Sequence, residues 1–181
     1  KTEFGLPNGI ADSGKIKVKV NIQGKLVEQE VHRIQILDPG TGTGTYIAEV
    51  IKLIYSRFEG QQGIWSNYVE NHLLPRLIGF ELLMASYAMA HLQIDLLLTE
   101  TGFKPTREQR LKIYLTNSLE ELHPDTGTLF ANWLSSEANE ANFVKRDCPV
   151  MVVMGNPPYS GESANKGEWI MSLMEDYKKE P

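Results

Sequence analysis

The sequence predicts an α/β fold of about four parallel strands with helices on both faces, preceded by an N-terminal β-hairpin. Short apolar runs alternate with longer segments whose apolar residues recur at helical spacing. Such alternation indicates a parallel sheet with right-handed crossovers. A glycine-rich turn also joins the first predicted parallel strand to a helix, which completes a strand–turn–helix unit.

Each predicted element rests on its own local pattern. Alternating polar and apolar residues predict the hairpin, with its lysines on a solvated face, and continuous apolar runs predict the parallel strands. Apolar residues three and four apart predict the helices, and glycine or proline residues separate them. The expected elements in chain order are hairpin strands at 15–20 and 25–31, a strand at 33–37, helices at 45–58 and 65–74, a strand at 77–80, a helix at 83–97, a strand at 111–115, a helix at 134–141, a fully buried strand at 150–154 and an amphipathic helix at 167–178.

Length and composition favour a single globular domain. The chain has 181 residues, of which 41% are hydrophobic and 23% charged, which are ordinary values for such a domain. We expect one domain over 1–181, with a loop and hairpin in 1–32 and the ligand-binding region in 33–181. Cys148 is the only cysteine, so no intrachain disulfide can form and a reducing, cytoplasmic compartment is expected. We predict that Cys148 is a small buried residue beside a strand.

Several residue types argue against a membrane span or a metal site. The longest apolar stretch, 77–98, contains polar residues such as Glu81 and Asp95, so it predicts a strand and a mostly buried helix rather than a membrane-spanning helix. The histidines lack the spacing of metal ligands, so no metal is expected. The tryptophans are expected to be core or interface anchors. The histidines are His32, His72, His91 and His123, and the tryptophans are Trp65, Trp133 and Trp169.

The segment 38–46 has the sequence DPGTGTGTY and suits a cofactor that the backbone approaches closely. Its glycines at 40, 42 and 44 allow a tight turn without side-chain obstruction. The lysine of a phosphate-binding loop is absent, and Ile47 occupies the position of the third glycine in a dinucleotide fingerprint. Asp38 can attract the positively charged methionyl part of S-adenosylmethionine. A plain tight turn between a strand and a helix is the alternative.

Two other predicted strand ends can bind the rest of this cofactor. Glu81 can accept hydrogen bonds from both ribose hydroxyls. Asn117 or Ser118 can meet the adenine ring, and Asn117 could equally cap the turn that follows it. Because ligands bind at the carboxyl ends of parallel strands, we expect these residues, Asp38 and Asn156 at one edge of the sheet.

The segment 156–159 has the sequence NPPY and suits a flat base whose amino group must be held. The side-chain oxygen of Asn156 and the carbonyl of Pro157 can accept hydrogen bonds from the two N–H groups of the amine. Such bonds favour the pyramidal, reactive geometry of the amine. The successive prolines Pro157 and Pro158 hold such a turn rigid. Tyr159 offers a ring for stacking on a base taken out of the helix. A structural Pro-Pro turn at the end of a strand is the alternative.

These two segments resemble motifs of the amino-methyltransferases, specifically the N6-adenine DNA methyltransferases of restriction-modification systems. Segment 38–46 is similar to the first cofactor motif, DPACGSGxF, with Gly40, Thr41 and Tyr46 in place of alanine, cysteine and phenylalanine. Segment 156–159 matches the catalytic motif (N/D)PP(Y/F). The order of the two is that of the gamma-type enzymes. Segment 38–46, with GFEL at 79–82 and the long helix after it, is most similar to large single-chain enzymes of the type ISP or IIG kind.

The resemblance implies a Rossmann-like S-adenosylmethionine-dependent methyltransferase fold, of which this chain would hold a part. It implies that Tyr46 occupies a packing position, and that Asn117 stands where the family usually has aspartate. The implied cofactor-binding residues are Asp38, Pro39, Gly40, Thr41, Gly42, Gly44, Tyr46, Glu81, Asn117 and Ser118. The implied catalytic residues, which would hold a flipped adenine, are Asn156, Pro157, Pro158 and Tyr159.

The resemblance also carries expectations about partners. A formal net charge of −5 is unusual for a protein that holds DNA alone, because phosphate contacts supply most of the affinity. We therefore expect DNA to be bound through regions missing from this chain, including the target-recognition region, with a fused helicase or nuclease as a candidate partner. The chain begins at Lys1 and stops soon after the catalytic segment, so we expect a fragment of a prokaryotic cytoplasmic enzyme that is inactive by itself.

Other readings of the same motifs stay open. Methyltransferases of guanine amines in RNA and of glutamine amides in proteins share the cofactor fold and an NPPY-type loop. A nicotinamide oxidoreductase is disfavoured by the missing third glycine and by the NPPY segment. A non-catalytic α/β interaction domain would bind no nucleotide cofactor.

Overall fold

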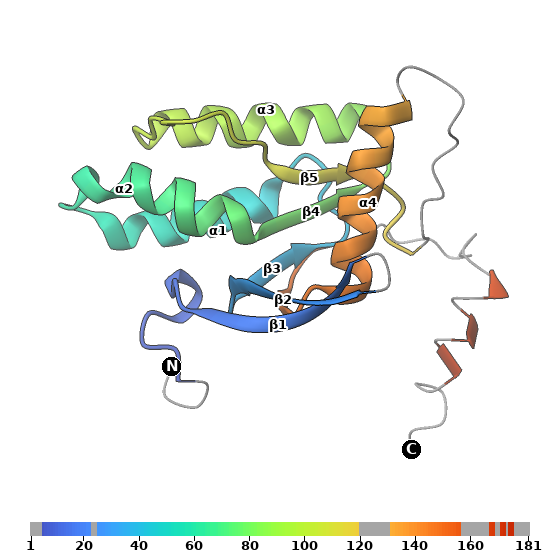
Figure 1. The fold of residues 1–181 in the computed structure, drawn as a ribbon. Helices are drawn as coiled ribbons and strands as arrows, with labels where there is room; N and C mark the ends of the chain where they lie inside the picture. Colours follow the sequence, from blue (N-terminus) through green and yellow to red (C-terminus); the bar gives the residue numbers. More distant parts are fainter. Residues whose placement is uncertain are drawn as a thin grey trace.

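The computed structural model describes residues 5–22, 25–119, 131–156, 167–168, 171–172 and 174–175, with the backbone alone at 20–22, 25 and 131–136. Four parallel strands form its central sheet in the order β5-β4-β3-β6 (Figure 1). The strands are β3 (Gln35–Asp38), β4 (Leu77–Glu81), β5 (Lys112–Leu115) and β6 (Val150–Val153). The predicted α/β fold with four parallel strands is confirmed.

The helices cover both faces of this sheet. The crossovers from β3 to β4 and from β4 to β5 contain α1 (Thr45–Tyr55) and α3 (Met84–Glu100), and α4 (Ala131–Asp147) joins β5 to β6. Neighbouring strand residues point to opposite faces. Ile36 and Ile113 therefore enter the hydrophobic core under α1 and α3, whereas Phe80 and Tyr114 enter a second core under α4. The reversal of strand order places β3 beside β6, so the chain switches faces between these two strands.

The N-terminal segment forms the predicted hairpin. A short 3₁₀ helix, η1 (Gly9–Ala11), precedes β1 (Lys15–Ile22) and β2 (Lys25–His32), which pair antiparallel. Lys15 forms an ion pair with Glu30 at 3.5 Å, and Lys17 forms one with Glu28 at 2.8 Å, all four side chains being largely exposed. The prediction that the hairpin lysines lie on a solvated face is confirmed.

Helix α3 corrects one prediction. The sequence predicted a mostly buried helix, but only Ala90, Ile94 and Leu98 of α3 are buried. Four of its large apolar residues are about half exposed: Met84, Met89, Leu92 and Leu96. The helix is apolar on most of its circumference, whereas it packs on the core along one line, so periodicity could not show which side is covered. Among the described residues, no helix is long and apolar enough to cross a membrane.

Strand β6 and helix α4 correct two more predictions. Strand β6 was predicted to be fully buried, yet Met151 and Val153 are 44% and 65% exposed because β6 is the edge of the described sheet. Helix α4 is 17 residues long, whereas the sequence predicted a helix only at 134–141 within a polar, irregular region. Its mean hydropathy is low, so the apolar stripe that binds the sheet gives a weak periodic signal.

The remaining elements differ from prediction mainly at their ends. Helix α1 ends at Tyr55 and continues as a 3₁₀ turn, and Trp65 is buried in the core as predicted. The predicted helix at 65–74 begins earlier and consists of several short turns. These are α2 (Gln62–Tyr68), the π-helical η3 (Val69–Leu73) and the 3₁₀ turn η4 (Leu74–Arg76), whereas η2 (Ser56–Phe58) is the 3₁₀ continuation of α1. Four of the predictions lie outside the described residues. They concern His123, the side chains of Trp133 and Trp169, and most of the helix predicted at 167–178.

Candidate cofactor and catalytic site

The carboxyl ends of the four strands form one edge of the sheet, and the predicted site residues lie along it. Asp38 and Glu81 are the last residues of β3 and β4. Asn117 follows β5 by two residues, and Asn156 follows β6 by three. Because β3 and β6 flank the point where the strand order reverses, this edge is where a ligand binds in an open α/β sheet. Pro157, Pro158 and Tyr159 lie outside the described residues.

The glycine-rich turn folds over the end of β4. The Thr41 amide donates to the Phe80 carbonyl at 2.9 Å, and the Gly42 amide donates to Glu81 Oε2 at 2.7 Å. Gly44 has a φ of 91° and lies where a β-carbon would come within 3.3 Å of the Ala90 backbone. A residue with a side chain would therefore be strained there and would push α3 away from the turn.

Asp38 is a fully buried carboxylate with one oxygen unsatisfied. Its side chain is 0% exposed, and Oδ1 accepts a hydrogen bond from the Gly40 amide at 3.1 Å. Within the described residues, Oδ2 has no hydrogen-bond partner. Burial raises the pKa of Asp38, the Glu81 carboxylate raises it further, and the Gly40 amide opposes both effects. An unsatisfied buried acceptor is costly, so a ligand that brings a donor or a positive charge to this oxygen would be stabilised.

Glu81 connects the glycine-rich turn to the beginning of α3. Its Oε2 accepts the Gly42 amide, and its Oε1 accepts the amides of Leu82 and Leu83 at 2.9 and 2.8 Å. A carboxylate has about four acceptor positions, so this half-buried group retains one for a ribose hydroxyl. A second hydroxyl would have to replace one of the three amides.

The loop after β5 shows the capping contact of Asn117 and places Ser118 beside a hollow. Asn117 Oδ1 accepts the Leu119 amide at 3.0 Å, which is the capping arrangement expected as an alternative. Asn117 and Ser118 are nevertheless half-buried, and Ser118 lines a hollow of about 520 Å³ together with Pro39 and Lys145. The hollow therefore adjoins one residue of the glycine-rich segment and one of the β5 loop.

The segment that leads into Asn156 touches Asp38. The Met154 amide donates to the Leu37 carbonyl at 3.0 Å, which continues the pairing of β6 with β3. At Gly155 a β-carbon would lie 2.6 Å from Asp38 Oδ1, so only glycine fits without moving the carboxylate. Asn156 follows immediately and is exposed. The sequence analysis did not predict a role for Gly155, although a glycine at the end of a strand can indicate a close approach of the backbone.

Thr41, in the glycine-rich segment, has contacts that the sequence did not predict, and Tyr46 differs from its predicted position. Thr41 is buried, and its hydroxyl donates to the Asp38 carbonyl at 3.1 Å. Gly79 makes room for Thr41, because a β-carbon there would lie 2.4 Å from Thr41 Oγ1. Tyr46 is 43% exposed, so the packing position predicted for it is wrong. The next residue, Ile47, is the first residue of α1 that packs in the core.

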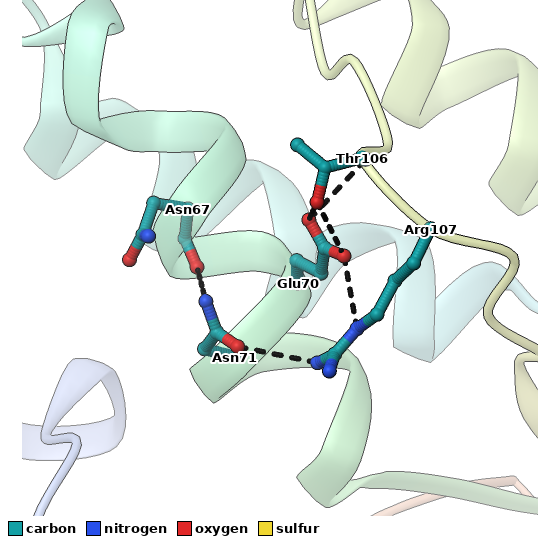
Figure 2. A network of polar contacts seen from close by, with 5 residues as sticks. All are labelled: Asn67, Glu70, Asn71, Thr106 and Arg107. Carbon is teal, nitrogen blue, oxygen red and sulfur yellow. Dashed lines mark hydrogen bonds and ion pairs between the residues drawn. The ribbon is translucent and has the colours of Figure 1, made fainter.

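The amino ends of the strands form the opposite edge, where the buried Glu70 and Arg76 are paired. Glu70 accepts hydrogen bonds from Thr106 Oγ1 at 2.8 and 2.9 Å and forms an ion pair with Arg107 at 2.9 Å (Figure 2). Arg76 is 0% exposed and donates to the carbonyls of His72 and Ile10, each at 2.6 Å. These two buried groups are therefore satisfied by the chain's own atoms.

The other titratable groups show no sign of a metal centre or a nucleophile. Within the described ranges, no group of three or more His, Cys, Asp or Glu residues is placed to hold a metal ion. His32 Nε2 and His72 Nδ1 are 3.2 Å apart, and burial is the largest cause that lowers the pKa of His32 to about 4. Cys148 is half-buried against the core under α4, and burial raises its pKa, which disfavours the reactive thiolate.

The solved structures that are similar to this fold include three that hold DNA or a DNA substrate mimic. One is a nuclease-deletion mutant of the type ISP restriction-modification enzyme LlaGI in complex with a DNA substrate mimic, with a TM-score of 0.57, 22% sequence identity, and coverage of 78% of this chain and 12% of that chain. The second is the ATP-dependent type ISP restriction-modification enzyme LlaBIII bound to DNA, with a TM-score of 0.56 and 25% sequence identity. The match covers 73% of this chain and 9% of that chain. The third is a DrdV–DNA complex, with a TM-score of 0.53 and 26% sequence identity, and the match covers 79% of this chain and 13% of that chain.

These similarities concern a small part of much larger proteins. The chain spans between 9% and 13% of the length of the three chains that it matches. No protein-family model and no curated protein sequence matches it. The fold of this chain is therefore similar to a portion of type ISP restriction-modification enzymes.

Proposed function

We propose that this chain is the cofactor-binding and catalytic-loop part of an adenine-specific DNA methyltransferase that uses S-adenosylmethionine in a restriction-modification system. The observation that carries the proposal is the contact between the two motifs: Gly155, which leads into Asn156, lies against the Asp38 carboxylate at the switch point of the sheet. A methyl donor held at Asp38 would thus lie beside the segment that holds the methyl acceptor.

The residues present fit this cofactor. The unsatisfied Oδ2 of Asp38 suits a positively charged ligand, and Glu81 retains an acceptor position for a ribose hydroxyl. The glycine-rich turn leaves open space at Gly42, where a β-carbon would meet no atom within 4 Å. When bound, S-adenosylmethionine would supply an electrophilic methyl group. The side-chain oxygen of Asn156 and the carbonyl of Pro157 would accept hydrogen bonds from the target amine.

DNA is favoured over the other substrates of NPPY-type enzymes. RNA guanine amines and protein glutamine amides have the same amine or amide chemistry at this loop. The similar solved structures, however, hold DNA or a DNA mimic. We therefore infer that the acceptor is the N6 amine of an adenine flipped out of DNA, held by regions of a longer protein.

Calorimetry on the 181-residue chain tests the cofactor half of the proposal. We expect S-adenosylmethionine and S-adenosylhomocysteine to bind and NAD to give no heat. Asp38→Ala should abolish binding, whereas Asp95→Ala, at an exposed position on α3, should not change it. Binding of NAD in preference to both methionine cofactors would refute the proposal.

The acceptor half is tested by label transfer from methyl-tritiated S-adenosylmethionine. The longer protein that contains this chain would be offered duplex DNA, structured RNA or a glutamine-containing peptide. We expect label in DNA adenine alone, and no label with Asn156→Ala, which should still bind cofactor. Label in RNA or peptide but not in DNA would reassign the substrate while keeping the cofactor.

A further inference from the structure

Helix α4 holds the loop that follows β5, and one of its lysines does so beside the proposed cofactor site. Lys145 Nζ donates to Thr116 Oγ1 at 2.8 Å and to the Asn117 carbonyl at 2.7 Å. The same ammonium group lies 5.3 Å from the centre of the Phe80 ring on β4. One side chain therefore joins α4 to the ends of two neighbouring strands.

The two acceptors fix the position of a backbone turn. The Thr116 amide donates to the Glu81 carbonyl at 2.8 Å, which anchors the start of the turn to β4. Asn117 Oδ1 accepts the Leu119 amide, which closes the turn at its other end. Lys145 holds the middle of the turn, through a hydroxyl and a carbonyl to which a cation donates strongly.

Lys145 also lies beside the hollow that adjoins the glycine-rich segment. Lys145 is half-buried and lines the 520 Å³ hollow together with Ser118 and Pro39. Removing it would leave the Asn117 carbonyl without this donor, and the turn that carries Ser118 could then relax. Other α4 contacts, such as Glu137 with the Leu115 amide at 2.8 Å, hold β5 itself and not the turn.

We propose that Lys145 is a positioning residue for the adenine ring of the cofactor. It acts through the backbone of the turn at 116–118, which presents Asn117 and Ser118 to the base. The inference rests on the proposed function, since it assumes that an adenine-containing cofactor binds at this edge. It assigns a role in base recognition to a residue that belongs to neither sequence motif.

The test compares two ligands that differ only in the base. S-adenosylhomocysteine and S-inosylhomocysteine would be titrated against the wild-type chain, Lys145→Met and Lys145→Arg. We expect Lys145→Met to weaken S-adenosylhomocysteine about tenfold and S-inosylhomocysteine much less, so that the preference for adenine falls. Lys145→Arg, which can still donate to both oxygens, should restore most of the preference. Lys52→Met, which removes an exposed ion pair with Glu49 on α1, is the matched control and should change neither affinity.

A second measurement needs no ligand. Amide hydrogen exchange at Leu119 should accelerate in Lys145→Met, while exchange at Ile113 in β5 stays slow. An equal loss of affinity for both ligands, unchanged affinities, or an unchanged Leu119 amide would each overturn the role of Lys145. If the wild-type chain bound neither ligand, the proposed cofactor site would fail first, and the role of Lys145 would fail with it.

Discussion

The two edges of the central sheet are built from similar residues but are satisfied to different degrees. At the amino edge, the buried Arg76 donates three hydrogen bonds, and Glu70 is surrounded by Thr106 and Arg107. At the carboxyl edge, the equally buried Asp38 has an oxygen with no partner among the described residues, and its pKa is raised. The buried groups named at the amino edge are paired, whereas the carboxyl edge has a buried acceptor that no described residue satisfies.

This difference separates stability from binding. Substitutions at the amino edge should lower the free energy of unfolding and leave the cofactor affinity of the folded protein unchanged. Substitutions at the carboxyl edge should lower the affinity for the proposed cofactor and should not lower the free energy of unfolding, because strain at a binding site is released when the ligand binds. The following experiments could break this contrast or sharpen it.

The largest expected effect is that of Arg76→Met. The substitution leaves the carbonyls of His72 and Ile10 and the Tyr68 hydroxyl without a buried donor. We expect a loss of about 3 to 5 kcal/mol in the free energy of unfolding, measured by urea denaturation. If the variant is too unstable to purify, Arg76→Lys, which retains a cation, should show a smaller loss of the same kind. A fully stable Arg76→Met would contradict the structural role of this edge.

Protonation of His32 should have the next largest effect. Its pKa is lowered to about 4 by burial, and then by His72, Arg76, Lys15 and Lys112. A lowered folded-state pKa gives stability that is present above the unfolded pKa of 6.5 and is lost as the pH falls toward 4. The shift corresponds to about 3 kcal/mol.

Denaturation curves between pH 7 and pH 4 would measure this loss. His32→Gln keeps a hydrogen-bonding side chain that cannot be protonated, so its stability should depend less on pH over the same interval. The half-buried His72 and His91, whose pKa values are also lowered, will leave part of the slope in place. A slope identical to that of the wild type would remove His32 from the explanation.

Asp38→Asn tests the carboxyl edge. The variant keeps an oxygen for the Gly40 amide but loses the negative charge, so cofactor affinity should fall by about 10- to 100-fold. Because the pKa of Asp38 is raised, its ionised form destabilises the folded chain above the ordinary pKa of 3.8. The ligand-free variant should therefore be at least as stable as the wild type at pH 7, and the advantage should vanish in acid. A variant that is both less stable and fully able to bind would reverse the contrast.

Thr106→Val should have the smallest effect. It removes one hydroxyl donor from Glu70, which keeps Arg107 as a partner (Figure 2). The expected loss is about 1 kcal/mol. Thr99→Val is the matched control, because the Thr99 hydroxyl donates to the Asp95 carbonyl on the exposed side of α3. Equal losses in the two variants would show that the Glu70 network adds nothing to stability.

The sequence was sufficient to predict the sheet and the edge on which the site residues lie. Strands buried on both faces have continuous apolar runs, and a parallel sheet necessarily brings the residues after those runs to one edge. Asp38 and Glu81 were therefore placed correctly without any knowledge of their contacts. The capping role of Asn117 was also foreseen, because that contact is local.

Contacts between distant segments could not be predicted in this way. The hydrogen bond from Gly42 to Glu81, the fit of Gly155 against Asp38 and the contact of Lys145 with the β5 loop all depend on how elements pack. The exposure of α3 and β6 depends on which neighbours cover them, and an apolar pattern carries no such information.

The pairing of β3 with β6 has a consequence for the order of folding. Leu37 pairs with Val153, so the two halves of the proposed site lie roughly a hundred residues apart along the chain. During synthesis, Asp38 and the glycine-rich turn leave the ribosome long before their partner strand exists. A pocket that contains both Asp38 and Asn156 can therefore form only after residue 156 has emerged, so the proposed cofactor could not use both residues to assist any earlier step in folding.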